Sequence, residues 1–315
     1  MPVYTRVFRS VPLLWTVILI QSLLLVTGGW LFHQQSRRHS LDSIRRDLRL
    51  ARQAYHHRID AVRLSMETAA TAEGFRTAVA RADTSVLIPR LEGIARIANL
   101  GFAGVVTPDG RVMCRIHSEN KNGRYPSGRN PTAELALSRG ETVAGTVVLD
   151  RGILEAENPA LAQQARIPVL FSEKGSIPMA VETAGIGISA AVPVITEGEP
   201  AGAVYGGVLL NRDEQLPAQI AKALFETDLQ DSDSSGTVAV YFRNLLVAAS
   251  PIEEGGPTLG FQMDLNIARR VLVAGETLAG TGTTGNEGMI SAVHPLTDIF
   301  DQRVGMLSVG RRTGR

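Results

Sequence analysis

Two residues of a predicted strand, Arg115 and His117, carry side chains that could bind an anion. They alternate along the stretch GFAGVVTPDGRVMCRIHS (residues 101–118), so both are expected on one face of the strand. A guanidinium and an imidazole on one face can meet a carboxylate through charge-assisted hydrogen bonds. The alternative is ordinary surface polarity, because a sheet face that no helix covers is normally solvated. We predict ligand binding here and keep that alternative open.

Four further residues are weaker candidates for the same site. They lie on the predicted sheet or its flanking loops, where they could supply donors, acceptors and an aromatic wall for an amphiphilic ligand. These residues are Arg129, Glu182, Ser189 and Tyr205. The same residue types are common on ordinary protein surfaces, which is the competing interpretation for each of them.

The sequence offers little for metal or covalent chemistry. Cys114 and His117 lie on opposite faces of the predicted strand, so they would chelate a metal poorly, and there is no second cysteine. Gly202, Gly206 and Gly207 lack the lysine and the strand-turn-helix context of a phosphate-binding loop. No GxSxG, HExxH or kinase-type signature occurs. We therefore expect a protein that is not an enzyme and that uses no cofactor and no metal.

Repeated patterns indicate that the elements carrying these residues occur twice. Isolated echoes arise by chance, but three that recur in one order indicate a duplicated unit. The pairs are ISAxxP at 188–193 and 290–295, GxxxxG at 202–207 and 305–310, and GETxAGT at 140–146 and 275–281. We expect each unit to contain a helix and an antiparallel sheet of about five strands, so the fold class is α+β with two tandem modules.

The first unit is the longer one. Gly140 and Ile188 lie 48 positions apart, whereas Gly275 and Ile290 lie 15 apart, so the first unit carries about 33 additional residues. Additional loop material over one sheet is where a ligand site is usually built. The first unit is therefore the predicted binding module.

The amino-terminal part of the chain is predicted to be helical. Residues 11–32 carry no charge over a length sufficient to span a bilayer, which favours a transmembrane anchor over a cleaved signal peptide. Leu41, Leu48, Tyr55 and Val62 then follow seven apart, as in a long helix with a coiled-coil seam. We expect this helix to pass from a dimer contact to packing on its own domain; the alternative is simply a long amphipathic helix.

The expected organisation has six parts. Residues 1–10 precede the anchor at 11–32, and a long helix with a helical connection covers 33–100. The first module covers 101–227, the second covers 228–310, and 311–315 form a tail. Net charge is only +1 over 315 residues, so nothing in the composition supports binding to nucleic acid.

Residues 101–310 resemble the double Cache domains of bacterial chemoreceptors, sensor histidine kinases and related signalling proteins. The passages that carry the resemblance are TPDGRV (107–112), ARIPV (165–169), YGGVLLNRD (205–213), GTV (236–238) and VGMLSVG (304–310). The resemblance implies two PAS-like modules outside the bacterial inner membrane, in the periplasm or outside the cell, the first distal and the second proximal. It also implies a single-pass topology with residues 1–10 in the cytoplasm.

The function expected from this resemblance is sensing. The protein would bind a small organic ligand, such as a carboxylate or an amino acid, and relay the signal as a homodimer or through a partner protein. Relatives continue from the last strand into a second membrane helix and an output domain, whereas here only Arg311 to Arg315 follow, so we expect a sensor without an output domain of its own. The alternative is a structural or dimerisation partner of another receptor that binds no small molecule.

Overall fold

The computed structural model describes residues 11–117, 129–170, 180–225, 236–250, 258–282 and 289–312, with side chains from Ser40 onward. The helices are α1 (Val11–Thr71), α2 (Glu73–Ala80), α3 (Thr84–Ala98), α4 (Pro131–Arg139), α5 (Arg151–Glu157), α6 (Pro159–Ala165), α7 (Gln215–Phe225) and α8 (Leu265–Leu272). The strands are β1 (Phe102–Val106), β2 (Val112–Arg115), β3 (Val143–Leu149), β4 (Ile167–Val169), β5 (Ala180–Glu182), β6 (Gly185–Thr196), β7 (Glu199–Leu209), β8 (Gly236–Phe242), β9 (Leu245–Ser250), β10 (Leu278–Thr281), β11 (Met289–Thr297) and β12 (Arg303–Arg312).

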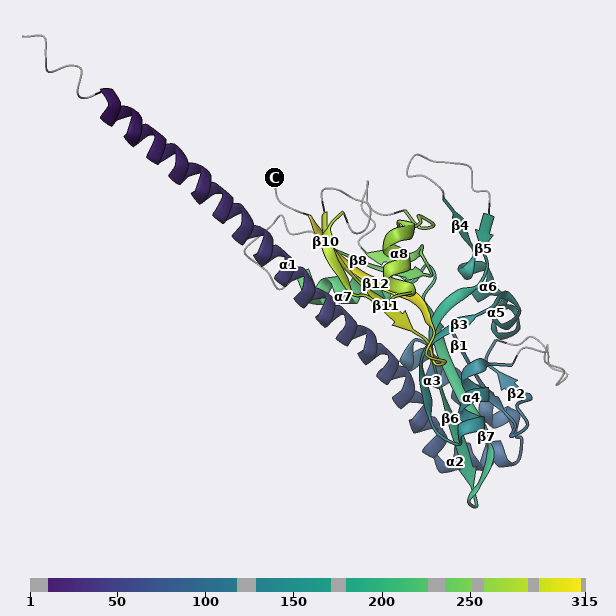
Figure 1. Cartoon of the computed structure of the whole chain (residues 1–315). Coiled ribbons are helices and arrows are strands. Elements are labelled where there is room, and N and C mark those ends of the chain that lie inside the picture. The colour runs from purple at the N-terminus through teal and green to yellow at the C-terminus, as the bar shows by residue number, and fades with distance from the viewer. Residues whose placement is uncertain are drawn as a thin grey trace, which may run out of the picture.

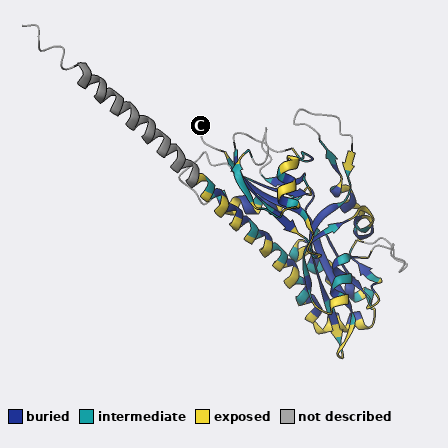
Figure 2. Ribbon diagram, in the orientation of Figure 1, coloured by how far each residue is buried: buried dark blue, intermediate teal, exposed yellow. Residues whose placement is uncertain are grey.

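The long helix α1 runs along the whole folded part of the chain and projects beyond it (Figure 1). The predicted seam residues Leu48, Tyr55 and Val62 are all buried, against the chain's own sheets. The expectation that this stripe begins as a dimer contact is therefore wrong for the described residues from Ile44 onward. Figure 2 shows the result, since the sheet side of α1 is buried and the opposite side is exposed.

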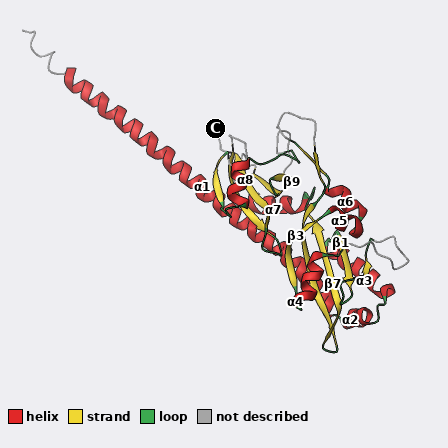
Figure 3. Cartoon of the chain, turned by 45° about the vertical axis from the view of Figure 1, so that its right-hand side comes forward, coloured by secondary structure: helices red, strands yellow, loops and turns green. Residues whose placement is uncertain are grey.

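The first sheet is antiparallel with the strand order β2-β1-β7-β6-β3. Helices α1, α2 and α3 pack on one face, where they share a hydrophobic core with β6 and β7. Helices α4, α5 and α6 cover the other face and form a separate core with Phe102, Leu149 and Tyr205. Figure 3 shows helices on both sides of these strands. Most strand residues on the α4–α6 face are therefore shielded from solvent.

The second sheet has the order β10-β11-β12-β8-β9, which is the same arrangement with β8, β9, β10, β11 and β12 in the places of β1, β2, β3, β6 and β7. The sequence echoes fall on equivalent positions of the two ladders. Ser189 lies between Gly145 and Gly207, and Ser291 lies between Gly280 and Gly310. The predicted duplication is thus present in strand order and in register.

Local sequence explains how α4 is placed. The side chain of Asn130 accepts hydrogen bonds from the backbone N–H groups of Thr132 and Ala133, at 3.1 and 3.3 Å, and Pro131 occupies the first turn. Gly140 ends the helix in the left-handed region at φ 68°. These two caps fix both ends of the helix that covers the first sheet.

The two sheets are joined through β3 and through the additional segment of the first unit. Thr146 on β3 accepts a hydrogen bond from the N–H of Ile299 at 3.0 Å, and its hydroxyl lies 2.9 Å from the Tyr55 hydroxyl of α1. Beyond β4, the N–H of Leu170 donates to the carbonyl of Gly260 at 2.9 Å. The first contact joins β3 of the first sheet, and the second joins the segment after β4, to loops of the second unit.

The Asn211 side chain, just after β7, bonds the backbone of Ile186 and Ala165, each at 3.0 Å, and α7 begins four residues later at Gln215. The predicted anchor at 11–32 lies outside the residues whose side chains are described. Among those that are described, no helix is both long and apolar enough to cross a membrane.

Candidate functional site

A row of residues directly opposite one another on the α4–α6 face of the first sheet defines the candidate site. Arg115 on β2 is paired with Gly104 on β1, Gly104 with Tyr205 on β7, and Tyr205 with Ala191 on β6. Gly104 has no side chain, and a Cβ there would lie 2.5 Å from the Tyr205 hydroxyl. The arginine and the tyrosine therefore meet over this glycine.

Arg115, Tyr205 and Glu157 form a compact buried cluster. Arg115 Nε donates to the Tyr205 hydroxyl at 3.1 Å and lies 3.2 Å from Glu157 Oε1. The Tyr205 hydroxyl in turn donates to Glu157 Oε1 at 2.8 Å. The exposed fractions of the three residues are 1, 0 and 2 %. A buried ion pair that shares a phenol is costly to desolvate, so its presence alone is weak evidence that it stabilises the fold.

Burial dominates the electrostatics of this cluster. It raises the pKa of Glu157, and the charge of Arg115 offsets part of that effect. Burial also raises the pKa of Tyr205 well above its ordinary value, with the nearby Glu157 carboxylate acting in the same direction. For Arg115, burial lowers the pKa, but the neighbouring Tyr205 and Glu157 outweigh it and the pKa rises overall. Tyr205 is thus neutral and able to donate to the carboxylate.

The amino terminus of α4 brings further polar groups to the cluster. Asn130 is buried, and its amide lies close enough to Glu157 to lower the pKa of that carboxyl, although no hydrogen bond of ordinary geometry joins them. Three buried atoms here make no hydrogen bond within the described residues: Asn130 Nδ2, Thr132 Oγ1 and Glu157 Oε2. Buried polar groups are normally paired, so the site has donors and an acceptor available to a ligand.

The structure brings together only part of the predicted set. Ser189 is buried on β6, and its hydroxyl donates to the carbonyl of Gly206 at 3.2 Å. Since β2 ends at Arg115, His117 does not share its strand face and is exposed in the following turn. Arg129 is exposed and pairs with Glu134 at 3.2 Å. Glu182, on β5, pairs with Arg243 of the second unit at 3.3 Å.

Sequence reasoning missed Glu157, Asn130 and Thr132. The signals for them were indirect, because Glu157 lies in the additional segment of the first unit and Asn130-Pro131 is a common start of a helix. Neither signal indicates that these residues approach Arg115. In the part of the chain that the structure describes, no group of three or more histidine, cysteine or acidic residues could hold a metal ion.

The chain is similar to several known proteins in sequence or in fold. Residues 208–315 match the sequence model of the family Single cache domain 3. No curated protein sequence matches the chain significantly. The periplasmic domain of Vibrio cholerae LuxQ superposes with a TM-score of 0.50 at 11% identity, over 86% of this chain and 100% of that one. The sensor domain of the V. cholerae histidine kinase DctB has a TM-score of 0.45 at 11% identity, over 89% of this chain and 100% of that one. The ligand-binding domain of the Pseudomonas aeruginosa amino acid chemoreceptor PctB in complex with L-Arg has a TM-score of 0.39 at 12% identity, over 89% of this chain and 96% of that one.

The second sheet falls within the matched region, and the first sheet repeats its strand order. The match over residues 208–315 confirms, for that part of the chain, the resemblance to Cache domains inferred from the sequence.

Proposed function

We propose that the protein is a membrane-anchored extracytoplasmic sensor that binds a small zwitterionic or carboxylate-bearing molecule, such as an amino acid, at the Arg115–Glu157–Tyr205 cluster. The observation that carries the proposal is the cluster itself, a buried ion pair beneath helices α4 and α5 beside three hydrogen-bonding atoms that make no bond within the described residues. The Cache fold agrees with a sensing role but does not specify the ligand.

The composition of the site favours a ligand that bears both charges. Glu157 Oε2 can accept from an ammonium group, whereas Asn130 Nδ2 and the Thr132 hydroxyl can donate to a carboxylate. Arg115 contributes positive charge on the same side of the sheet. A purely cationic or purely anionic ligand would leave one of these groups without a matching partner, which is costly in a buried site.

The additional segment of the first unit offers a route for the signal. Glu157 ends α5, α6 follows at once, and the chain after β4 bonds to the second unit between Leu170 and Gly260. Closure of α5 on a ligand would therefore move a segment attached to the second unit. Such coupling requires two defined states whose balance the ligand alters.

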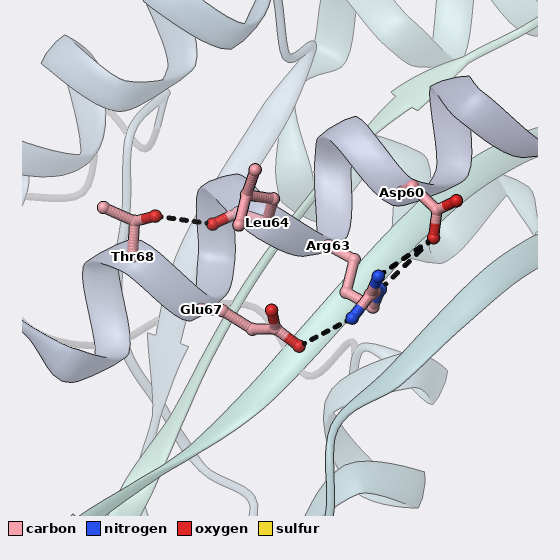
Figure 4. A network of polar contacts seen from close by, with 5 residues as sticks. All are labelled: Asp60, Arg63, Leu64, Glu67 and Thr68. Atoms are coloured by element: carbon pink, nitrogen blue, oxygen red, sulfur yellow. Dashed lines mark hydrogen bonds and ion pairs between the residues drawn. The ribbon is translucent and has the colours of Figure 1, made fainter.

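We further propose that residues 11–32 anchor the chain in the bacterial inner membrane and that α1 pairs with α1 of a second copy. The exposed side of α1 carries Leu50 and Leu64, 54% and 62% exposed, with His57 and Ala61 between them at heptad-like spacing. Arg63 links Asp60 and Glu67 beside this stripe, at 3.1 and 3.2 Å (Figure 4). Signals would leave through this dimer or through a partner protein that carries the output domain.

A thermal-shift screen of the full-length chain in detergent, against amino acids and small carboxylates, tests ligand binding. A ligand at about 100 times its Kd stabilises the native state by about 2.7 kcal/mol. We expect Thr132→Val to weaken binding about tenfold without lowering the stability of the free protein, because its hydroxyl makes no bond within the described residues.

The matched control is Thr196→Val, which removes a similar buried hydroxyl near the far end of β6 and should leave binding unchanged. If no compound stabilises the chain and a membrane protein co-purifies with it, the alternative role as a structural or dimerisation partner is favoured. Sedimentation of Leu64→Asp tests the α1 pairing separately: the variant should be monomeric, and a dimer of unchanged affinity would contradict the pairing.

A further inference from the structure

A second polar cluster lies far from the ligand site, between α1 and the second sheet. His294 is on β11, on the same face as Ala292 and Leu296, which share the hydrophobic core that includes α1. The Thr277 hydroxyl lies 2.7 Å from His294 Nδ1. Arg52 and His56 of α1 are one helical turn apart, so they lie side by side on the helix. Because α1 packs on β11 and both residues act electrostatically on His294, the four groups lie near this junction.

The positive charge of this cluster is not neutralised by its neighbours. Arg52 and His56 are the charged groups that act on His294, and together with burial they lower the pKa of His294 to about 4. The carboxylates near these residues in sequence pair with other cations, Asp47 with Arg311 at 2.7 Å, Asp60 with Arg63 at 3.1 Å and Glu276 with Arg270 at 2.9 Å. No carboxylate of the described residues is among the charges that act on His294.

Arg52 gives an independent indication of a ligand. Its Nε is buried and makes no hydrogen bond within the described residues. A buried guanidinium nitrogen is normally paired with an acceptor. When the His294 ring is protonated, its Nδ1–H donates to the Thr277 hydroxyl and its Nε2–H is left to donate to a ligand. An anion with several oxygens would satisfy both donors and offset the charge.

We propose that Arg52, His56, His294 and Thr277 form a binding site for a soluble oxyanion of the size of sulfate or phosphate, at the junction of α1 and the second sheet. Arg52 is the central charged donor, His294 and Thr277 supply the sheet side, and His56 closes the exposed side. The bound anion joins α1 to the second unit. The site lies roughly 30 Å along the helix from residue 32, at 1.5 Å per residue, which is too far for a lipid headgroup at the end of the proposed anchor.

The test uses the full-length chain in detergent and inorganic sulfate, whose charge does not change between pH 5 and 8. Calorimetric titration at constant ionic strength, balanced with sodium chloride, should show saturable binding that tightens as pH falls, since the anion favours protonated imidazole. Histidine ¹⁵N spectra should show sulfate raising the pH at which His294 titrates. Absence of saturable binding, or binding that does not depend on pH, would overturn the proposal.

Matched variants locate the site. Arg52→Gln should weaken sulfate binding about tenfold, while Arg49→Gln, exposed one turn away, should bind as the native chain does. His56→Gln, at an exposed position, should fold normally and bind about threefold more weakly, so it decides the matter if the Arg52 variant is unstable. Equal affinity in all variants contradicts the site. Competition by phosphatidylglycerol bicelles contradicts a soluble source of the oxyanion.

Discussion

Arg115 and Tyr205 lie on strands that do not pair with each other, yet the guanidinium Nε and the phenol oxygen are 3.1 Å apart. The strand between them, β1, contributes Gly104 at the point of contact, and both side chains extend over it. The cluster therefore depends on the absence of one side chain in the strand between its members.

Gly104→Ala should destabilise the protein, by about 1–3 kcal/mol, since the new Cβ would meet the Tyr205 hydroxyl at 2.5 Å and the Cys114 carbonyl at 2.7 Å. Urea unfolding followed by circular dichroism measures the change. Gly93→Ala in α3 is the control: a Cβ there has nothing within 4 Å, so helix propensity should stabilise the chain by about 0.5–1 kcal/mol. Equal effects at the two glycines would refute the steric explanation.

Tyr205→Phe should cost about 1–3 kcal/mol, because the phenol both donates to Glu157 and accepts from Arg115 in a buried site. The comparable substitution Tyr241→Phe removes the hydroxyl of a buried tyrosine in the second sheet, for which no hydrogen bond is found among the described residues, and should cost less. Unfolding free energies of the two variants give the comparison. A Tyr205 variant as stable as the native chain would mean that the phenol contributes nothing net.

Stability should fall as pH decreases from about 6.5 toward 4, in chloride and without sulfate. The pKa of His294 is lowered to about 4 in the folded state. As pH falls through this window the unfolded state takes up a proton that the folded state does not, so the free energy of unfolding decreases. Because His294 is only partly buried, the expected loss is on the order of 1–2 kcal/mol. His294→Gln should remove this part of the dependence, whereas His57→Gln, on the exposed side of α1, should not.

The contact between Asp47 on α1 and Arg311 on β12, at 2.7 Å and largely shielded from solvent, should show measurable coupling. A double-mutant cycle with Asp47→Asn and Arg311→Gln is expected to give about 1 kcal/mol or more. The same cycle at the exposed Asp60–Arg63 pair should give at most about 0.5 kcal/mol. Indistinguishable coupling energies would mean that shielding does not strengthen the Asp47 contact.

The sequence predicted much of the architecture because its evidence is local or repeated. The residues Pro108-Asp109-Gly110, a sequence that favours a tight turn, lie between β1 and β2, with Gly110 at φ 79°. The echoes at Ser189 and Ser291 predicted two equivalent sheets. The proposed division into modules at residue 228 stays a prediction, since most of the boundary segment lies outside the described residues.

The sequence could not reveal which surfaces cover one another. A seven-residue spacing marks an apolar stripe on a helix, and the stripe at Leu48, Tyr55 and Val62 is the same whether a second helix or the chain's own sheets cover it. Glu157 was missed for a similar reason, because its approach to Arg115 depends on how α5 crosses the sheet. The bonds of Asn211 were equally out of reach of sequence reasoning, because its partners lie 25 and 46 positions away.

The long helix α1 makes a separate polar contact with each of the two sheets. Tyr55 holds it to Thr146 of the first sheet, and Asp47 holds it to Arg311 of the second. The two contacts are eight residues apart, or about 12 Å of helix. If the angle between the sheets changed while α1 slid along either sheet, one of these contacts would break. With both contacts kept, the change would bend or twist these two turns of the helix. Distortion of the helix between Asp47 and Tyr55 would thus follow the angle between the modules, and a probe placed there would report that angle.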